Sequence, residues 1–472
     1  MTESIKQATS LSFATQSATR VINLGLSILF VRLAPASSIG VFTLLIAAAQ
    51  LVCSLGRVGT NYSYSVLLPQ QQQEAERFQL TATYLIFGLA SSLIVAMIAL
   101  SQLTHATGIS EITLNHTWLF SGLTLAYLLS DSLSETIWSI HLALGRFKAV
   151  FLRDVWIALG KGFLPLAGAL WLGPLGVASG LGLISVLNCW ISTTLLRRHA
   201  PGLKVFTDRT WISWRLLTQL LLKGIPFFSV PLVSNLILWP LLMTVVSSSG
   251  IEKLDSLRVA QICAQVIGII SASVIPVLLI KSSHQTQAGP HMHQTAFQAC
   301  WFISILIYGL YALSDRTLLP LIFGNRAGDG AIQIARILVA AAAVQGLSQI
   351  PMQRPLPTRT LVQLSLLQIG SLIVAAFVAI VTFAPTSRGL LAYASINLLS
   401  PLLTVVCLPA VLGQNLMPGE RTPWLQIGIS MALLSTCFLI NSDPFQIGLL
   451  VMSLGLIFYG NRGLILDLKP WR

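Results

Sequence analysis

Apolar stretches about as long as a membrane crossing recur along the whole chain. A helix needs roughly 20 mostly apolar residues to cross a bilayer. Breaks at charged residues, proline and glycine divide the sequence into fourteen such segments, at 11–34, 39–67, 78–101, 113–143, 150–172, 174–197, 217–247, 255–281, 297–322, 329–352, 360–384, 388–413, 423–440 and 444–461. The sequence therefore predicts an all-α polytopic membrane protein with about 14 transmembrane helices.

Composition and charge distribution support the same class of protein. The 472 residues are 54% hydrophobic and only 9% charged, whereas soluble domains are about a quarter charged. In a soluble protein the net charge of +13 would suggest a nucleic-acid partner, but a membrane protein gathers lysine and arginine on its cytoplasmic side. With both termini inside, seventeen basic residues fall at inner ends and six at outer ends. We therefore expect cytoplasmic termini and no nucleic-acid partner.

Weak internal similarity predicts two lobes. The second segment contains GVFTLLIAAAQLVCSLG and the eighth contains DSLRVAQICAQVIGIIS, an offset of six helices. An even offset preserves topology, so the halves are expected to be parallel repeats about an axis along the membrane normal. The expected organisation is an N-terminal six-helix lobe at 1–200, a cytoplasmic interfacial linker at 201–216, a C-terminal six-helix lobe at 217–415, and two additional helices with a cytoplasmic tail at 416–472.

Two predicted helices carry polar stripes, each with an arginine among amide and hydroxyl side chains. Residues at i, i+4, i+7 and i+11 share one face of a helix. The first stripe consists of Gln16, Arg20, Asn23 and Ser27, and the second of Gln50, Ser54, Arg57 and Asn61. Faces of this polarity are expected to point at protein or water, not at lipid.

Depth in the membrane extends this pattern to a polar layer. At 1.5 Å per residue, Arg20, Arg57, Glu135 and Lys161 all lie roughly 12–17 Å above the cytoplasmic ends of their predicted helices. Asp131 lies one turn further out than Glu135. The sequence therefore predicts one layer with three bases and two acids, on helices one, two, four and five.

This layer allows two interpretations, an ion-pair network that locks the helices together or a hydrated cavity that holds an anion. Bases outnumber acids, and the planar fork of arginine suits phosphate, which favours the anion. Arg336, near the outer end of its predicted helix, either lines a cavity or anchors an outer loop. The candidate substrate-binding residues are Arg20, Asn23, Gln50, Arg57, Asn61, Lys161 and Arg336, and the ion-pair or coupling candidates are Asp131 and Glu135.

Other features bear on mechanism. Three prolines, Pro226, Pro231 and Pro240, punctuate the seventh predicted helix, which is either the bending element of the protein or statically kinked. The sequence contains no GxxxxGK[ST] nucleotide-binding loop and no HExxH metal motif. No nucleophile–base pair is apparent. We therefore expect no enzymatic activity, no cofactor and no metal.

Several stretches resemble the oligosaccharide flippases of the multidrug/oligosaccharidyl-lipid/polysaccharide exporter superfamily. They are LFVRLAPASSIGVFTLLIAAAQLVCSLGRVGTNYSYSVLLP, HLALGRFKAVFLRD, WLGPLGVASGLGL and LLRRHAPGL, within residues 10–200. The resemblance implies two six-helix lobes around a central cavity, and alternating access that carries a polyprenyl-diphosphate-linked oligosaccharide to the outer leaflet. The cationic cavity of the family would map onto Arg20, Arg57 and Lys161.

The resemblance also implies a location in the bacterial cytoplasmic (inner) membrane. Expected partners are the lipid-linked glycan, membrane lipids, and polysaccharide polymerisation or export proteins. Two other functions stay open. One is a cation-coupled multidrug exporter of the same fold, whose cavity would be dominated by acids rather than bases. The other is a non-transporting membrane scaffold for glycan assembly, which has no need of a hydrated charged centre.

Overall fold

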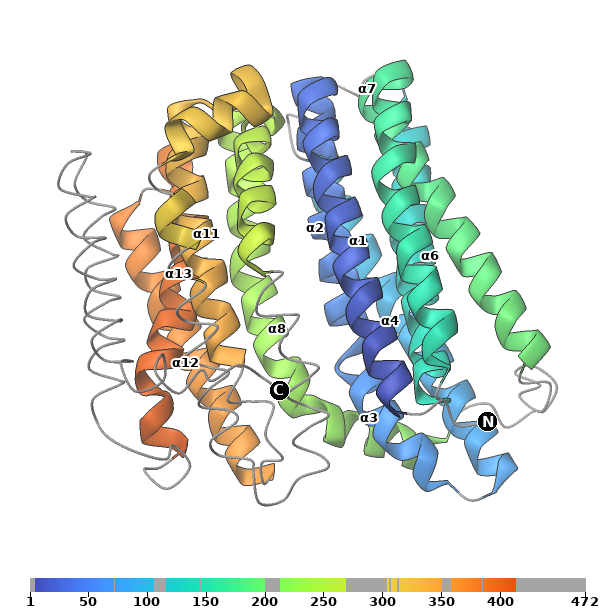
Figure 1. Ribbon diagram of the computed structural model, residues 1–472. Coiled ribbons are helices and arrows are strands. Elements are labelled where there is room, and N and C mark those ends of the chain that lie inside the picture. The colour runs from blue at the N-terminus through green and yellow to red at the C-terminus, as the bar shows by residue number, and fades with distance from the viewer. Residues whose placement is uncertain are drawn as a thin grey trace, which may run out of the picture. The chain divides into compact units, whose positions relative to one another are not determined.

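The computed structural model describes residues 5–412 apart from 72, 106–115, 145, 200–212, 269–303, 305–306, 312–313, 350–357 and 384. Every regular element in this part of the chain is a helix (Figure 1). The α-helices that the structure describes from end to end are α1 (Ile5–Leu33), α2 (Ala36–Arg57), α3 (Thr60–Leu67), α4 (Glu74–His105), α6 (Thr117–Ala143), α7 (Phe147–His199), α8 (Trp214–Ser249), α11 (Asp329–Gln349), α12 (Thr358–Thr382) and α13 (Pro385–Leu412). The predicted segments 423–440 and 444–461, and most of the predicted linker 201–216, lie outside the described residues.

The described helices have the length and composition of membrane spans. Six stretches are long and apolar enough to cross a bilayer: Ala36–Arg57, Glu74–His105, Leu152–Arg198, Phe228–Ser249, Arg359–Thr382 and Arg388–Leu408. Each coincides with a predicted segment, and Leu152–Arg198 covers two of them. The prediction of an all-α polytopic membrane protein is confirmed.

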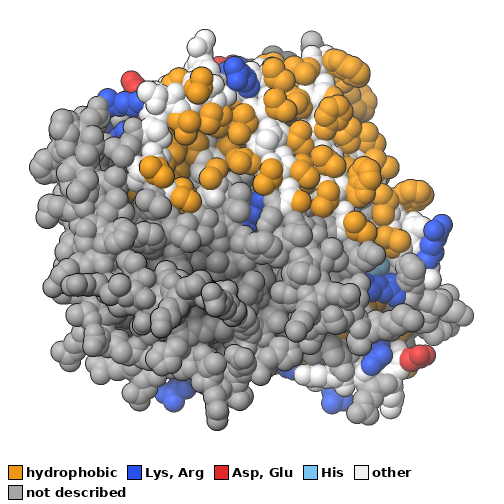
Figure 2. Space-filling model, in the orientation of Figure 1, with side chains coloured by type: hydrophobic (Ala, Val, Ile, Leu, Met, Phe, Trp, Pro, Cys, Tyr) orange, Lys and Arg blue, Asp and Glu red, His pale blue; other side chains and the backbone are white. Residues whose placement is uncertain are grey.

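Large apolar side chains cover much of the outside of these helices, as expected for contact with lipid. Leu93 on α4, Trp171 on α7 and Phe377 on α12 are all largely exposed. In Figure 2 the described surface is mainly hydrophobic, with few charged side chains among the apolar ones. A soluble monomer rarely exposes continuous apolar surface on this scale.

The chain divides into two compact units, residues 1–258 with 378–393, and residues 259–377 with 394–472. The first unit contains α1 to α8, together with the end of α12 and the start of α13. Its boundary therefore lies beyond the predicted linker at 201–216, and α8 packs against α2, α3 and α4. The four domain ranges given above remain predictions.

The second predicted segment, 39–67, is wrong as a single helix, because it breaks directly after Arg57. Val58 has φ 48° and Gly59 has φ 68°, so two consecutive residues adopt the left-handed conformation before α3 begins at Thr60. This conformation suits glycine but costs energy for a β-branched residue such as valine. Asn61 therefore lies beyond the break, and the helical spacing that grouped it with Gln50 and Arg57 does not extend to it.

The short helix α3 is held by a buried cluster on the far side of the break. Tyr64 stacks on Tyr84 with ring centroids 4.4 Å apart, and its hydroxyl shares a hydrogen bond of 2.8 Å with Thr81. Leu220 of α8 and Ile137 of α6 belong to the same cluster. Aromatic stacking with a satisfied hydroxyl fixes α3 against α4, α6 and α8.

Helix α7 is a hairpin of two membrane segments. Gly173 has a non-helical backbone with φ 59° and ψ −137°, and Pro174 follows it, which confirms the predicted division between 150–172 and 174–197. The two arms approach closely at glycines: a Cβ added at Gly168 would meet the backbone of Gly176, and one at Gly180 would meet the backbone of Leu164. Small residues at such positions let helix backbones pack closely inside a membrane.

This packing predicts that Gly168→Ala destabilises the protein. The added methyl group meets backbone atoms, which cannot rotate away, so we expect a loss of about 2 kcal/mol by overpacking. Gly122→Ala in α6 is the matched control, because nothing lies within 4 Å of the added Cβ. Thermal unfolding in detergent measures both variants. Equal melting temperatures for the two variants would contradict the close packing of the hairpin.

Candidate functional site

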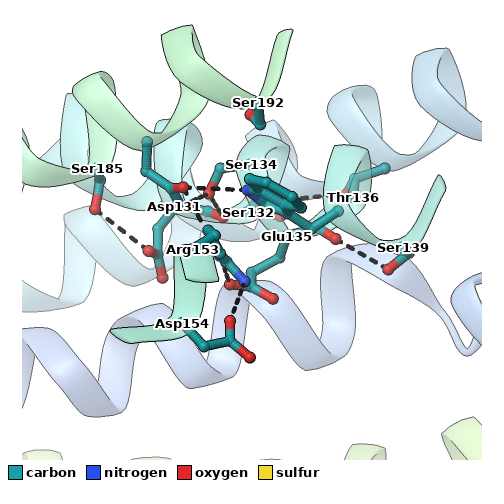
Figure 3. Close-up of polar contacts among 12 residues, drawn as sticks. Asp131, Ser132, Ser134, Glu135, Thr136, Ser139, Arg153, Asp154, Ser185 and Ser192 are labelled. Atoms are coloured by element: carbon teal, nitrogen blue, oxygen red, sulfur yellow. Dashed lines mark hydrogen bonds and ion pairs between the residues drawn. The ribbon is translucent and has the colours of Figure 1, made fainter. Parts of the chain in front are cut away.

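Helices α6 and α7 pack extensively against each other and hold a buried ion pair in the first unit. Lys161 Nζ of α7 lies 2.6 Å from Asp131 Oδ1 of α6. Ser185, on the second arm of α7, donates a hydrogen bond of 3.3 Å to the same carboxylate oxygen (Figure 3). Asp131 is only 4% exposed, so the pair neutralises a carboxylate that would be costly to bury alone.

A second charged cluster lies beside this pair, with Arg153 of α7 at its centre. Arg153 contacts Glu135 of α6 through Nη2, and Asp154 through Nη1 at 3.1 Å (Figure 3). Its guanidinium also donates to Asn188 Oδ1 at 3.3 Å and lies over the ring of Trp138, 5.2 Å from the centroid. One base thus serves two carboxylates and is fixed by an amide and an aromatic face.

Arg57 is the predicted site residue at the C-terminal end of α2. Its Nε donates a hydrogen bond of 2.7 Å to the carbonyl of Cys53, one turn back in the same helix. None of the ion pairs among the described residues involves Arg57. Glu135 nevertheless interacts electrostatically with Arg57 as well as with Lys161 and Arg153. The structure therefore brings Arg57 near the two charged clusters, and in the described part of the chain no carboxylate contacts it.

The other predicted residues of the first unit are spread around this layer. Arg20 and Asn23 are partly exposed on α1, which packs against α7. Gln50 is exposed on α2, and Asn61 is partly exposed on α3. The side chain of Gln16 lies outside the described residues. Among the described residues, Asn23, Gln50 and Asn61 form no side-chain hydrogen bond with Arg57.

Arg336, the remaining candidate, belongs to the second unit and forms a two-point contact with a carboxylate. It binds Asp315 through Nε and through Nη2, the latter at 3.0 Å from Oδ1. Asp315 is 1% exposed. This bidentate contact gives the Arg336 charge a buried counter-charge, and the role of Arg336 in substrate binding stays a prediction.

Two buried arginines were not among the sequence candidates. The side chain of Arg153 is only 9% exposed inside α7. Arg258 is 7% exposed, donates to Ser27 Oγ at 2.9 Å and lies over the ring of Phe42. The sequence signal for a buried Arg153 was the presence of two acids nearby, Glu135 on the preceding helix and Asp154 next to it in the chain. The sequence contains no comparable signal for Arg258.

The charges of the layer can be counted from these contacts. Arg20, Arg57, Arg153 and Lys161 are the bases, and Asp131, Glu135 and Asp154 are the acids. All three acids touch Lys161 or Arg153. The ion-pair interpretation therefore describes Lys161 and Arg153 on α7 with these three acids, and Arg57 contacts none of the three.

The fold that carries this site is that of a class of membrane transporters. Solved structures with the same fold include a lipid II flippase, MurJ, in an inward closed conformation, with a TM-score of 0.62 over 96% of this chain and 99% of that chain at 13% identity. An outward-facing multidrug resistance MATE transporter of the MOP superfamily matches with a TM-score of 0.52 over 84% and 93% at 14% identity. A eukaryotic MATE transporter matches with a TM-score of 0.53 over 87% and 96% at 14% identity.

Sequence comparison adds no closer relative. No family model matches the chain, and no curated protein matches it. The structural neighbours named above are transporters and not enzymes. The chain thus has the fold of MOP-superfamily transporters.

Proposed function

We propose that this protein carries a polyprenyl-diphosphate-linked oligosaccharide from the inner to the outer leaflet of the bacterial cytoplasmic membrane by alternating access. One observation carries the proposal: among the described residues Arg57 contacts no carboxylate, while the neighbouring bases Lys161 and Arg153 are paired. A permanent charge in a membrane protein is costly and marks a substrate path or a partner. A diphosphate offers the bidentate acceptors that a guanidinium prefers.

The same contacts weigh against a cation-coupled drug exporter. A site for organic cations needs a carboxylate whose charge is not already compensated. In the described part of this layer, Asp131, Glu135 and Asp154 each contact a base. The likeness to MATE transporters supports the shared fold, and the lipid II flippase shows that this fold also occurs in a protein named for a lipid-linked substrate.

A reconstituted flipping assay tests the proposal. Proteoliposomes carry a fluorescent short-chain polyprenyl-diphosphate glycan, and a membrane-impermeant quencher reports its transfer between leaflets. We expect transfer of this lipid and little transfer of the matching lipid with a neutral linkage. Uptake of a fluorescent organic cation without transfer of the diphosphate lipid would favour the drug exporter, and no transport of either would favour the scaffold.

The orientation required by this function gives a further prediction. The excess of basic residues at inner ends places both termini in the cytoplasm. A reporter that is active only in the cytoplasm should therefore be active when fused after Arg472. The same reporter inserted into the predicted outer loop at 250–254 serves as the control and should be inactive. The reverse pattern would overturn the assigned orientation.

A further inference from the structure

Arg57 lies between two contacts with the same neighbouring helix, α8. Ser54, one turn before Arg57, accepts a hydrogen bond of 2.8 Å from Asn235 Nδ2. Gly59, two residues after Arg57, meets Gly224 backbone to backbone, so closely that a Cβ on either residue would contact the other's main chain. The segment that carries Arg57 is therefore attached to α8 on both sides.

The part of α8 between these two contacts contains two of its three prolines. Pro226 and Pro231 both lie between Gly224 and Asn235 in the sequence. Each proline lacks the N–H that would bond to the carbonyl four residues back, so the helix is weakened at two successive points. Asn235 also donates to the carbonyl of Pro231 at 2.8 Å, which joins the proline turn directly to the contact with Ser54.

The segment that carries Arg57 also has an irregular backbone, next to its contact with Gly224 of α8. The left-handed pair Val58 and Gly59 interrupts the helical hydrogen bonds between α2 and α3. On one side of this break α2 packs mainly against α4, α6 and α7 and also contacts α8, and on the other side α3 packs mainly against α8 and α6. Arg57 is thus the last residue of α2, next to the break that separates α2 from α3.

We propose that Gly224 and Asn235 position Arg57, and that bending of α8 at Pro226 and Pro231 moves Arg57 through these two contacts. Bending changes the separation of Gly224 and Asn235. Because Gly59 and Ser54 follow them, the backbone on either side of Arg57 shifts, and the break at Val58 accommodates the change. This inference rests on the proposed function for what Arg57 binds, but the mechanical link is independent of it.

The first test uses the affinity for an anion to report whether Arg57 is held in position. Inorganic pyrophosphate is titrated against the purified protein at constant ionic strength, and the midpoint of its thermal stabilisation is recorded. One lost hydrogen bond of about 1 kcal/mol corresponds to about a fivefold change. We therefore expect Asn235→Ala and Ser54→Ala each to raise the midpoint about fivefold, and the double variant to do no more than either single variant. Thr244→Ala is the control, because its hydroxyl bonds only within α8.

The Arg57→Ala background separates positioning from a general structural effect. If Asn235 acts through Arg57, Asn235→Ala should change nothing further once Arg57 is removed. A midpoint for Asn235→Ala equal to that of the unmodified protein would overturn the positioning role. An equal additional loss in the Arg57→Ala background would overturn it as well.

Amide hydrogen exchange tests the link without any anion. In the full chain in nanodiscs, Gly224→Ala should speed exchange at residues 57–61, because the added methyl meets the backbone of Val58 and Gly59. Gly122→Ala should leave these amides unchanged. If Arg57→Ala still responds to pyrophosphate as the unmodified protein does, the proposed anion site is wrong. The hydrogen-exchange result alone then tests the mechanical link between α8 and the segment that carries Arg57. Unchanged exchange at 57–61 in both Gly224→Ala and Asn235→Ala would overturn it.

Discussion

Arg57→Ala should reduce glycan-lipid transfer by about 10- to 100-fold while the protein inserts and folds normally. A hydrogen bond to a charged group contributes about 1.5–3 kcal/mol, which is the range of this loss. Folding is expected to be unaffected because the substitution removes a charge that costs about 2.5–3.5 kcal/mol to insert and that pairs with no carboxylate in the described structure. Transfer in proteoliposomes, measured beside protein abundance, decides the outcome.

Two further variants sharpen this test. Arg57→Lys should keep part of the activity, because a point charge remains while the bidentate fork is lost. Arg32→Ala, at the exposed end of α1, is the matched control and should transfer at the unmodified rate. Full transfer by Arg57→Ala at normal abundance would end the anion-site proposal. Poor folding of Arg57→Ala, rescued by a second change at Glu135 or Asp131, would restore the ion-pair interpretation of Arg57.

Arg153→Met should have the largest effect on stability, a loss of about 2–3 kcal/mol. The Arg153 side chain is 9% exposed, and the side chains of Glu135 and Asp154, which are 33% and 37% exposed, both lose their base when it is removed. Methionine keeps most of the side-chain length, so packing against Trp138 changes little. The melting temperature in detergent and the amount of protein in the membrane measure the effect.

The charge explanation for Arg153 predicts a specific rescue. Adding Glu135→Gln to Arg153→Met removes one of the two unpaired carboxylates and should recover part of the lost stability. Arg198→Met, on an exposed position near the other end of α7, is the matched control and should be neutral. A melting temperature for Arg153→Met equal to that of the control would mean that water, not Arg153, compensates the two acids.

The sequence did not predict which charged residues pair with each other. Depth counting placed Asp131, Glu135, Arg57 and Lys161 in one layer, and in the structure Lys161 contacts Asp131 while Glu135 interacts electrostatically with Lys161 and Arg57. Depth counting did not predict that Lys161 would pair with Asp131. Partner choice depends on how each helix is rotated about its axis and on which helices pack together. Residue spacing within a single helix carries no information about either.

The break after Arg57 is a second feature that local pattern could not predict. The stretch from Gly40 to Leu67 has the pattern of one apolar helix with a polar stripe. At the break itself, Gly59 is the residue whose type suits a left-handed conformation. Valine at 58 has no intrinsic preference for a left-handed conformation. The conformation is held by neighbours distant in sequence, Gly224 of α8 on one side and the cluster around Tyr64 and Tyr84 on the other.

The sequence by itself determined the class of protein, the approximate positions of the described membrane segments apart from the break after Arg57, and the hairpin turn at Gly173, because hydropathy, proline and glycine act locally along the chain. Only the tertiary structure decided which charges are neutralised: it paired Lys161 with Asp131, placed Arg153 between Glu135 and Asp154, and left Arg57 beside the break in its helix. In a medium of low dielectric constant a charge acts according to the distance of its nearest counter-charge, and that distance exists only after the helices have packed.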